Sequence, residues 1–170
     1  LEVALTMCTM AAGEDGPAGL PAIIPLPAQM ERLAGQFALN AETEVLYEPR
    51  MPSNKVAAET FAGLLRPPTG LPLPVREGDG PTANTVYFGA IEHSEEMGGE
   101  GYRLWVTPDY ARVAAPSAAG LFYGIQTLRQ LLPPQALAKE PVANTEWTIP
   151  CVDITDTPRF AWRGMLVDVA

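Results

Sequence analysis

The stretch EGYRLWVTPDYARVAAPSAAGLFYGIQTLRQLLP, from Glu100 to Pro133, decides the fold of this chain. In its first half apolar side chains recur at every second position on both sides of the segment TPDY. The proline and the aspartate of that segment favour a turn. An alternation of period two on both sides of a turn predicts an antiparallel β-hairpin. Its inward positions are Tyr102, Leu104, Val106, Ala111, Val113 and Ala115.

The second half of this stretch predicts a helix. Its apolar stripe is made by Leu121, Ile125, Leu128 and Leu132, is widened by Phe122, and ends at Pro133-Pro134. Ser117 is the expected N-cap, because a serine side chain can accept a hydrogen bond from a free N–H of the first turn. Gly120 and Gly124 lie four positions apart, and glycine inside a helix costs roughly 1 kcal/mol relative to alanine. We therefore expect the backbone of this helix to approach the sheet closely at the two glycines.

An earlier helix is predicted over SNKVAAETFAGLLRPP. Ser53 or Asn54 can cap its start, and Pro67-Pro68 are expected to stop it. One apolar face follows from the spacing i, i+4, i+7 and i+8, at Ala57, Phe61, Leu64 and Leu65.

Three further segments read as strands. QFALNAETEVLYE suits one or two strands after a turn at Gly35, and TEWTIPCVDITDTP suits another. NTVYFGAI, residues 84–91, is apolar on both faces, so we expect it in the interior of the sheet. The order of elements predicts an α/β (α+β) sandwich with a mixed, partly antiparallel sheet and two helices on one face.

Composition excludes several functional classes. The chain has 11 basic and 20 acidic residues, for a net charge of −9, and lacks the basic block typical of nucleic-acid binding. No apolar run is long enough to cross a bilayer. His93 is the only histidine, Cys8 and Cys151 form no metal pattern, and we expect no metal or other cofactor. The two cysteines are expected to be unpaired.

Three segments together resemble glycoside hydrolase family 20, the β-N-acetylhexosaminidases. IIPLPAQMERLAGQFALN resembles the opening of the family's accessory domain, the stretch from Glu100 to Pro133 resembles its hairpin and second helix, and PRFAWRGMLVDVA is similar to the first strand of its catalytic (β/α)8 barrel. The resemblance implies an accessory α/β domain (21–157) and the start of a truncated barrel (158–170). Residues 1–20 match nothing in the family, and we expect them to be unstructured or signal-derived. The accessory domain would pack on its own barrel.

The family resemblance implies a retaining hydrolysis of terminal β-linked N-acetylglucosamine or N-acetylgalactosamine from glycans. The 2-acetamido group of the substrate is the nucleophile, assisted by an adjacent Asp-Glu pair. This chain has no matching pair, since Glu14-Asp15 and Glu95-Glu96 stand in the wrong places. We therefore expect these 170 residues to be inactive alone, with no catalytic residue among them.

One substrate-binding residue is implied by the same resemblance. Arg163, in the motif WRG, matches the family arginine that binds the hydroxyls on carbons 3 and 4 of the terminal sugar. A planar guanidinium can hold two adjacent hydroxyls, although a structural pairing with a carboxylate is the alternative. Trp162 suits a sugar platform or packing at a domain junction. Tyr123 and Gln126 read as packing and surface groups.

Other readings of the chain stay open. Related accessory domains precede the barrels of α-glucuronidases and of O-linked N-acetylglucosamine hydrolases. A stand-alone module that binds carbohydrate or protein would need an aromatic platform, for which Trp105 and Trp147 are the candidates. The apolar, then small, then polar residues 1–16 suggest either the end of an export signal, and thus a periplasmic, extracellular or surface location, or a disordered end.

Overall fold

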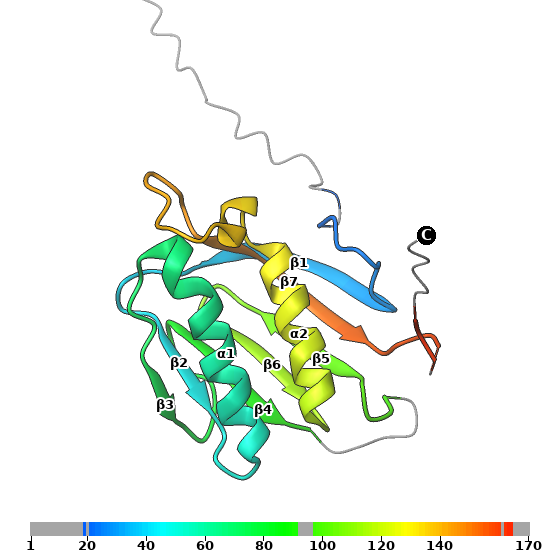
Figure 1. Cartoon of the computed structure of the whole chain (residues 1–170). Coiled ribbons are helices and arrows are strands. Elements are labelled where there is room, and N and C mark those ends of the chain that lie inside the picture. Colours follow the sequence, from blue (N-terminus) through cyan, green and yellow to red (C-terminus); the bar gives the residue numbers. More distant parts are fainter. Residues whose placement is uncertain (1–18, 20, 92–96, 161, 165–170) are drawn as a thin grey trace, which may run out of the picture.

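The computed structural model describes residues 19, 21–91, 97–160 and 162–164. These residues form a seven-stranded sheet in the order β1-β7-β5-β6-β4-β2-β3, with two helices on one face (Figure 1). The predicted sandwich is confirmed. In chain order the elements are β1 (Gln29–Ala38), β2 (Glu44–Tyr47), α1 (Pro52–Thr69), β3 (Val75–Glu77), β4 (Thr85–Ala90), β5 (Tyr102–Val106), β6 (Tyr110–Ala115), α2 (Ala118–Leu131), a 3-10 turn (Pro134–Leu137) and β7 (Thr148–Asp156).

The sheet is mixed, as the sequence predicts. Strand β2 pairs in parallel with β3 and β4, and β4 pairs in parallel with β6. The hairpin β5–β6 and the pairs β5–β7 and β1–β7 are antiparallel. The interior position of β4, between β2 and β6, is confirmed and agrees with the apolar residues on both of its faces.

The start of α2 and its close approach to the sheet are both confirmed. The Ser117 side chain accepts hydrogen bonds from the N–H groups of Ala119 and Gly120. A Cβ atom added at Gly120 would lie 2.1 Å from the carbonyl oxygen of Gly101, and one added at Gly124 would lie 2.5 Å from Cγ1 of Val113. The two glycines therefore let the helix sit directly on the hairpin.

The predicted ends of α1 are wrong. Met51 is the N-cap and makes no side-chain cap bond, while the buried Asn54 donates from Nδ2 to the Glu48 carbonyl at 3.0 Å. Pro67 and Pro68 lie inside the last turn, and the helix ends at the left-handed Gly70. Because proline has no backbone N–H, Pro67 and Pro68 leave only the carbonyls of Gly63 and Leu64 without a helical donor. Gly63 is exposed and Leu64 is half-buried, so this loss is tolerated.

Gly35 lies inside β1 and does not mark a turn between two strands, so that prediction is wrong. Its φ is +93°, and the pairing of β1 with β7 shifts register between Arg32 and Gln36. This is a β-bulge, which glycine accommodates because it has no Cβ atom. Pairing with β7 continues on both sides of the bulge, so the chain stays in one strand.

The core lies between the sheet and the two helices. Phe61 of α1 and Phe88 of β4 are fully buried, with ring centroids 5.6 Å apart. Trp147 is only 7% exposed and so cannot serve as a sugar platform. No helix in the described part of the chain is both long and apolar enough to span a membrane.

The two terminal segments lie largely outside the described residues. Of the predicted N-terminal segment only Gly19 is described. Residues 158–160 and 162–164 of the predicted barrel strand form no strand. A strand needs a neighbour for its backbone hydrogen bonds, and a barrel strand finds its neighbours in the barrel. The barrel strand therefore stays a prediction.

Candidate functional site

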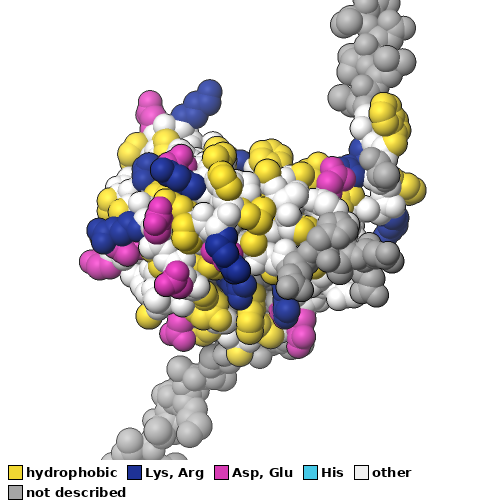
Figure 2. Space-filling model, turned by 90° about the horizontal axis from the view of Figure 1, so that it is seen from below, with side chains coloured by type: hydrophobic (Ala, Val, Ile, Leu, Met, Phe, Trp, Pro, Cys, Tyr) yellow, Lys and Arg dark blue, Asp and Glu magenta, His cyan; other side chains and the backbone are white. Residues whose placement is uncertain are grey.

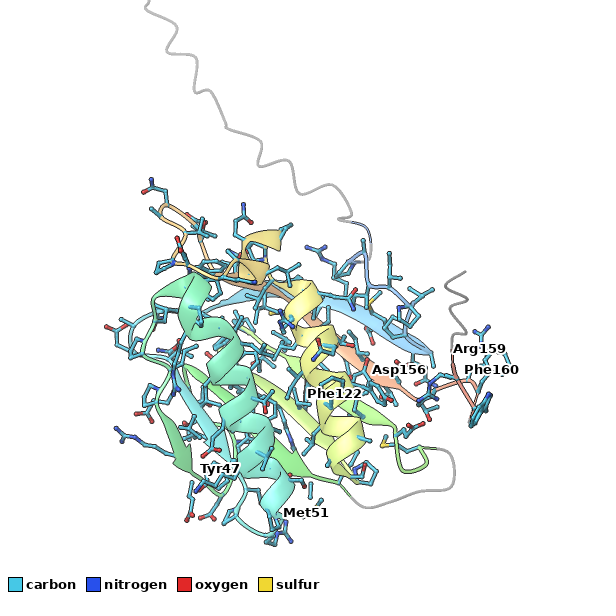
Figure 3. All side chains as sticks on the ribbon, in the orientation of Figure 1. Tyr47, Met51, Phe122, Asp156, Arg159 and Phe160 are labelled. Atoms are coloured by element: carbon cyan, nitrogen blue, oxygen red, sulfur yellow. The ribbon has the colours of Figure 1, made fainter. Side chains whose placement is uncertain are left out.

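The segment after β7 is attached to the domain but exposes its large side chains. Thr157 donates from its hydroxyl to the Met97 carbonyl at 2.9 Å. Phe160 and Trp162 are 66% and 90% exposed. Figure 3 shows Arg159 and Phe160 beyond Asp156, projecting from the end of β7. This segment carries Arg163, the one predicted substrate-binding residue.

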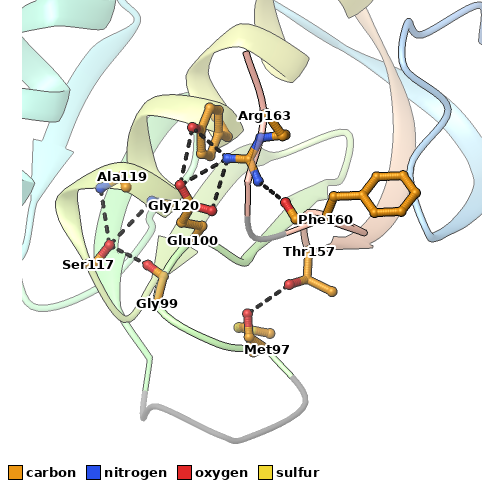
Figure 4. Close-up of polar contacts among 10 residues, drawn as sticks. Met97, Gly99, Glu100, Ser117, Ala119, Gly120, Thr157, Phe160 and Arg163 are labelled. Atoms are coloured by element: carbon orange, nitrogen blue, oxygen red, sulfur yellow. Dashed lines mark hydrogen bonds and ion pairs between the residues drawn. The ribbon is translucent and has the colours of Figure 1, made fainter.

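Arg163 is held by the domain itself (Figure 4). Its Nη2 donates to both carboxylate oxygens of Glu100 at 2.9 Å and to the Tyr123 hydroxyl at 3.1 Å. Its Nη1 donates to the Phe160 carbonyl at 2.6 Å, and the guanidinium lies 5.7 Å from the centroid of the Tyr123 ring. The hydrogen bonds to Glu100 and then to Tyr123 raise the pKa of Arg163, so the group stays charged.

The loop before β5 places Glu100 at this position. The Ser117 hydroxyl that caps α2 also donates to the Gly99 carbonyl (Figure 4). The next residue but one, Gly101, lies against Gly120 of α2. The start of α2 therefore fixes the loop, and Glu100 is directed toward Arg163 and Tyr123.

A groove of about 900 Å³ lies beside this cluster, between α2, the segment after β7 and residues 24–28. At its floor the Tyr102 and Thr127 hydroxyls are 2.6 Å apart, and Tyr102 also donates to Asp156 at 3.3 Å. Burial raises the pKa of Tyr102 well above its usual value, so this hydroxyl stays neutral. Because the polar groups of the floor already have partners, the groove is better suited to packing than to chemistry.

The rim of the groove is apolar and exposed. Ile24 and Leu26 are 81% and 71% exposed, and Phe160 stands on the opposite side. Gln130 of α2 ties this N-terminal segment down by accepting from the Ile24 N–H at 2.9 Å and donating to the Ile24 carbonyl at 3.1 Å. The groove therefore has a fixed floor and an apolar edge that another surface can cover.

The structure brings together residues that the sequence did not connect. Tyr123 packs against the core, as the sequence predicts, and its hydroxyl also accepts a hydrogen bond from Arg163. Tyr123 and Gln126 both line the groove. Glu100 was missed, because a contact across 63 positions leaves no local pattern. Among the described residues no group of three His, Cys, Asp or Glu side chains is placed to hold a metal.

At the end of the molecule seen in Figure 2, acidic and basic side chains are interspersed.

The geometry defines a two-layer α/β domain whose last strand leads to an arginine-bearing segment beside an apolar groove. The family model described as glycosyl hydrolase family 20, domain 2, matches residues 20–157. The chain belongs to this family.

Known relatives agree with this assignment. The chain is 34% identical over 154 residues to a β-N-acetylhexosaminidase of Cellulomonas fimi, covering 88% of the chain and 28% of that relative. It is 33% identical over 147 residues to a β-hexosaminidase of Porphyromonas gingivalis, covering 86% of the chain and 18% of that relative. The matched part of the chain thus spans only 18% to 28% of the length of these relatives.

Solved structures show the same fold. The N-acetyl-β-hexosaminidase of Streptomyces plicatus, in complex with Thio-NAglucal, superposes with a TM-score of 0.74 at 34% identity. The match covers 83% of this chain and 27% of the Streptomyces chain. The domain observed here is therefore similar to one part of a larger protein.

Proposed function

We propose that this chain is the domain 2 part of a β-N-acetylhexosaminidase that removes terminal β-linked N-acetylglucosamine or N-acetylgalactosamine from glycans. The match of residues 20–157 to domain 2 of family 20 carries the proposal. The named activities of the relatives from Cellulomonas fimi and Porphyromonas gingivalis support it.

Hydrolysis would take place in a barrel outside the 170 residues. A (β/α)8 barrel takes about 250 residues, far more than follow the domain 2 match in this sequence. In that barrel the 2-acetamido oxygen of the substrate would attack the anomeric carbon while a Glu protonates the leaving oxygen. A neighbouring Asp would orient the acetamido group, and water would then open the intermediate with retention. Domain 2 would contribute support, and Arg163, in the segment that follows it, would supply one sugar contact.

The helix face and the groove are the surfaces that we propose to pack on this barrel. Val56 of α1 and Phe122 of α2 are 61% and 51% exposed, and both helices lie on the same face of the sheet (Figure 1). The apolar rim of the groove adds Leu26 and Phe160 to this exposed set. Covering exposed apolar surface of this kind is favourable by about 25 cal/mol per Å².

Arg163 is proposed to bind the 3- and 4-hydroxyls of the terminal sugar. Its side chain is exposed and charged. Glu100 and Tyr123 hold it by side-chain hydrogen bonds, which a segment of the barrel could replace or share. A charge-assisted hydrogen bond contributes about 1.5–3 kcal/mol, and two hydroxyls can be held at once.

Replacing Arg163 in the whole protein tests this role. We expect Arg163→Gln to lower kcat/KM for an aryl N-acetylglucosaminide about 100-fold, which corresponds to about 2.7 kcal/mol. Arg76→Gln removes the same charge from an exposed site on β3 that does not line the groove, and it should change kcat/KM less than about threefold. Equal losses in the two variants would contradict a specific sugar contact.

Export is part of the same proposal. Residues 1–16 carry the apolar, then small, then polar order that follows an export signal. A glycan-degrading enzyme would meet its substrates outside the cytoplasm.

A further inference from the structure

Arg163, the proposed sugar contact, is held by two side chains of domain 2 that also bind each other. Its Nη2 donates to both carboxylate oxygens of Glu100 at 2.9 Å (Figure 4) and to the Tyr123 hydroxyl at 3.1 Å. The Tyr123 hydroxyl in turn donates to Oε1 of Glu100 at 3.4 Å. The three groups form a closed ring of hydrogen bonds, in which each side chain limits the movement of the other two.

These contacts occupy only part of the guanidinium. Both N–H groups of Nη2 are used by Glu100 and Tyr123, and Nη1 donates once, to the Phe160 carbonyl at 2.6 Å. A guanidinium has five N–H donors, so within the described residues these bonds leave two of them for a ligand. Arg163 can therefore bind two sugar hydroxyls while Glu100 and Tyr123 still hold it.

Both partners of Arg163 are themselves fixed. Tyr123 belongs to α2 and is partly buried against the core, and its ring lies 5.7 Å from the guanidinium. Glu100 lies between Gly99 and Gly101, in the loop that the start of α2 fixes. A free arginine side chain has many rotamers, and a rigid support removes most of that freedom before a sugar binds.

The position of Arg163 in the whole protein also calls for a partner in domain 2. Thr157 is tied to the Met97 carbonyl six positions earlier in the chain, so Arg163 stays near this domain. The side chains of Arg163 and Glu100 are each 40% exposed. A barrel that covers them removes much of their contact with water, and a charge without water needs an opposite charge beside it. Glu100 supplies that charge from the domain 2 side.

We propose that Glu100 is a positioning residue for substrate binding. It holds the guanidinium of Arg163 in the orientation that meets the 3- and 4-hydroxyls of the terminal sugar. Domain 2 thus takes part in substrate recognition as well as supporting the barrel. This role rests on the proposed sugar contact of Arg163, and a substrate that lacks one of the two hydroxyls separates a failure of one from a failure of the other.

Kinetics of the whole protein on two substrates test the role of Glu100. An aryl N-acetylglucosaminide carries both hydroxyls, and its 4-deoxy analogue lacks one of the two. We expect the wild-type protein to lose about tenfold in kcat/KM on the analogue. Glu100→Gln should lose about tenfold on the intact substrate, and its further loss on the analogue should be less than about threefold. A general structural defect would lower kcat/KM for both substrates alike, so an unchanged tenfold discrimination in Glu100→Gln would overturn the positioning role.

The same measurements show which of the two proposals fails. Wild-type kinetics in Glu100→Gln, together with a loss in Arg163→Gln, would leave the sugar contact of Arg163 standing and overturn the role of Glu100. A wild-type protein that hydrolyses the two substrates equally well would contradict the sugar contact itself, and the role of Glu100 with it.

A double variant and a matched control trace the effect to Arg163. In an Arg163→Gln background, Glu100→Gln should change kcat/KM less than about twofold, because the side chain that it positions is already absent. Glu44→Gln removes a carboxylate that lies 3.5 Å from Arg76, outside the groove, and should also change kcat/KM less than about twofold. Far-UV circular dichroism checks that each variant is folded. A tenfold loss from Glu100→Gln in the Arg163→Gln background, or an equal loss in Glu44→Gln, would refute the role of Glu100.

Discussion

Gly120→Ala is expected to destabilise the domain by about 3 kcal/mol or more. The new Cβ atom would stand 2.1 Å from the Gly101 carbonyl oxygen and 2.8 Å from the Ala115 Cβ. Neither obstacle is the flexible end of a side chain, so α2 must lift from the hairpin, and the contacts of Leu121 and Leu128 beneath it would be disturbed. Urea unfolding followed by circular dichroism would measure the loss in the free energy of unfolding.

The matched control is Gly63→Ala in α1. Gly63 lies in a helix too, but it is exposed, and a Cβ added there meets nothing within 4 Å. Alanine should therefore raise the free energy of unfolding by about 0.5–1 kcal/mol. Similar effects of the two substitutions, in either direction, would contradict the close packing of α2.

Phe61→Ala is expected to cost about 4 kcal/mol of stability. The Phe61 ring is fully buried between α1 and the sheet and lies against Phe88 at a tilt of 53°. Removing it leaves a cavity that rigid strand neighbours cannot fill. Thermal and urea unfolding of the 170-residue chain would both report the change.

Phe122→Ala provides the comparison at an exposed position. Phe122 is 51% exposed on α2 and contacts Tyr123 edge to face, so its loss from the 170-residue chain should cost less than about 1 kcal/mol. In the whole protein the same substitution should cost more, because we propose that the barrel covers this face. A Phe61→Ala loss no larger than that of Phe122→Ala would place the core elsewhere.

Local patterns in the sequence predicted the hairpin, α2 and its cap. Each depends on residues within a few positions of one another, as Ser117 does when it caps Ala119 and Gly120. The close approach of α2 to the sheet was also predictable from its two glycines, because glycine inside a helix is unfavourable unless close packing requires it.

Features that depend on distant partners were not predictable. The bulge at Gly35 follows from pairing with β7, more than 100 positions later, and sequence periodicity cannot show such a register shift. Asn54 was a predicted N-cap, but it is buried, and its side chain donates a hydrogen bond to the Glu48 carbonyl before the helix. The contact of Arg163 with Glu100 likewise depends on the finished fold, since the two residues lie on separate loops.

The central claim is tested most directly by measuring hydrolysis of a fluorogenic β-N-acetylglucosaminide. Two proteins are compared, the 170-residue chain alone and the whole protein that we propose it belongs to. We expect no turnover by the 170-residue chain, and turnover by the whole protein that first releases the β-anomer, as NMR would show. Turnover by the 170-residue chain alone would contradict a supporting role for this domain. A whole protein that leaves the substrate intact would contradict its assignment to a β-N-acetylhexosaminidase.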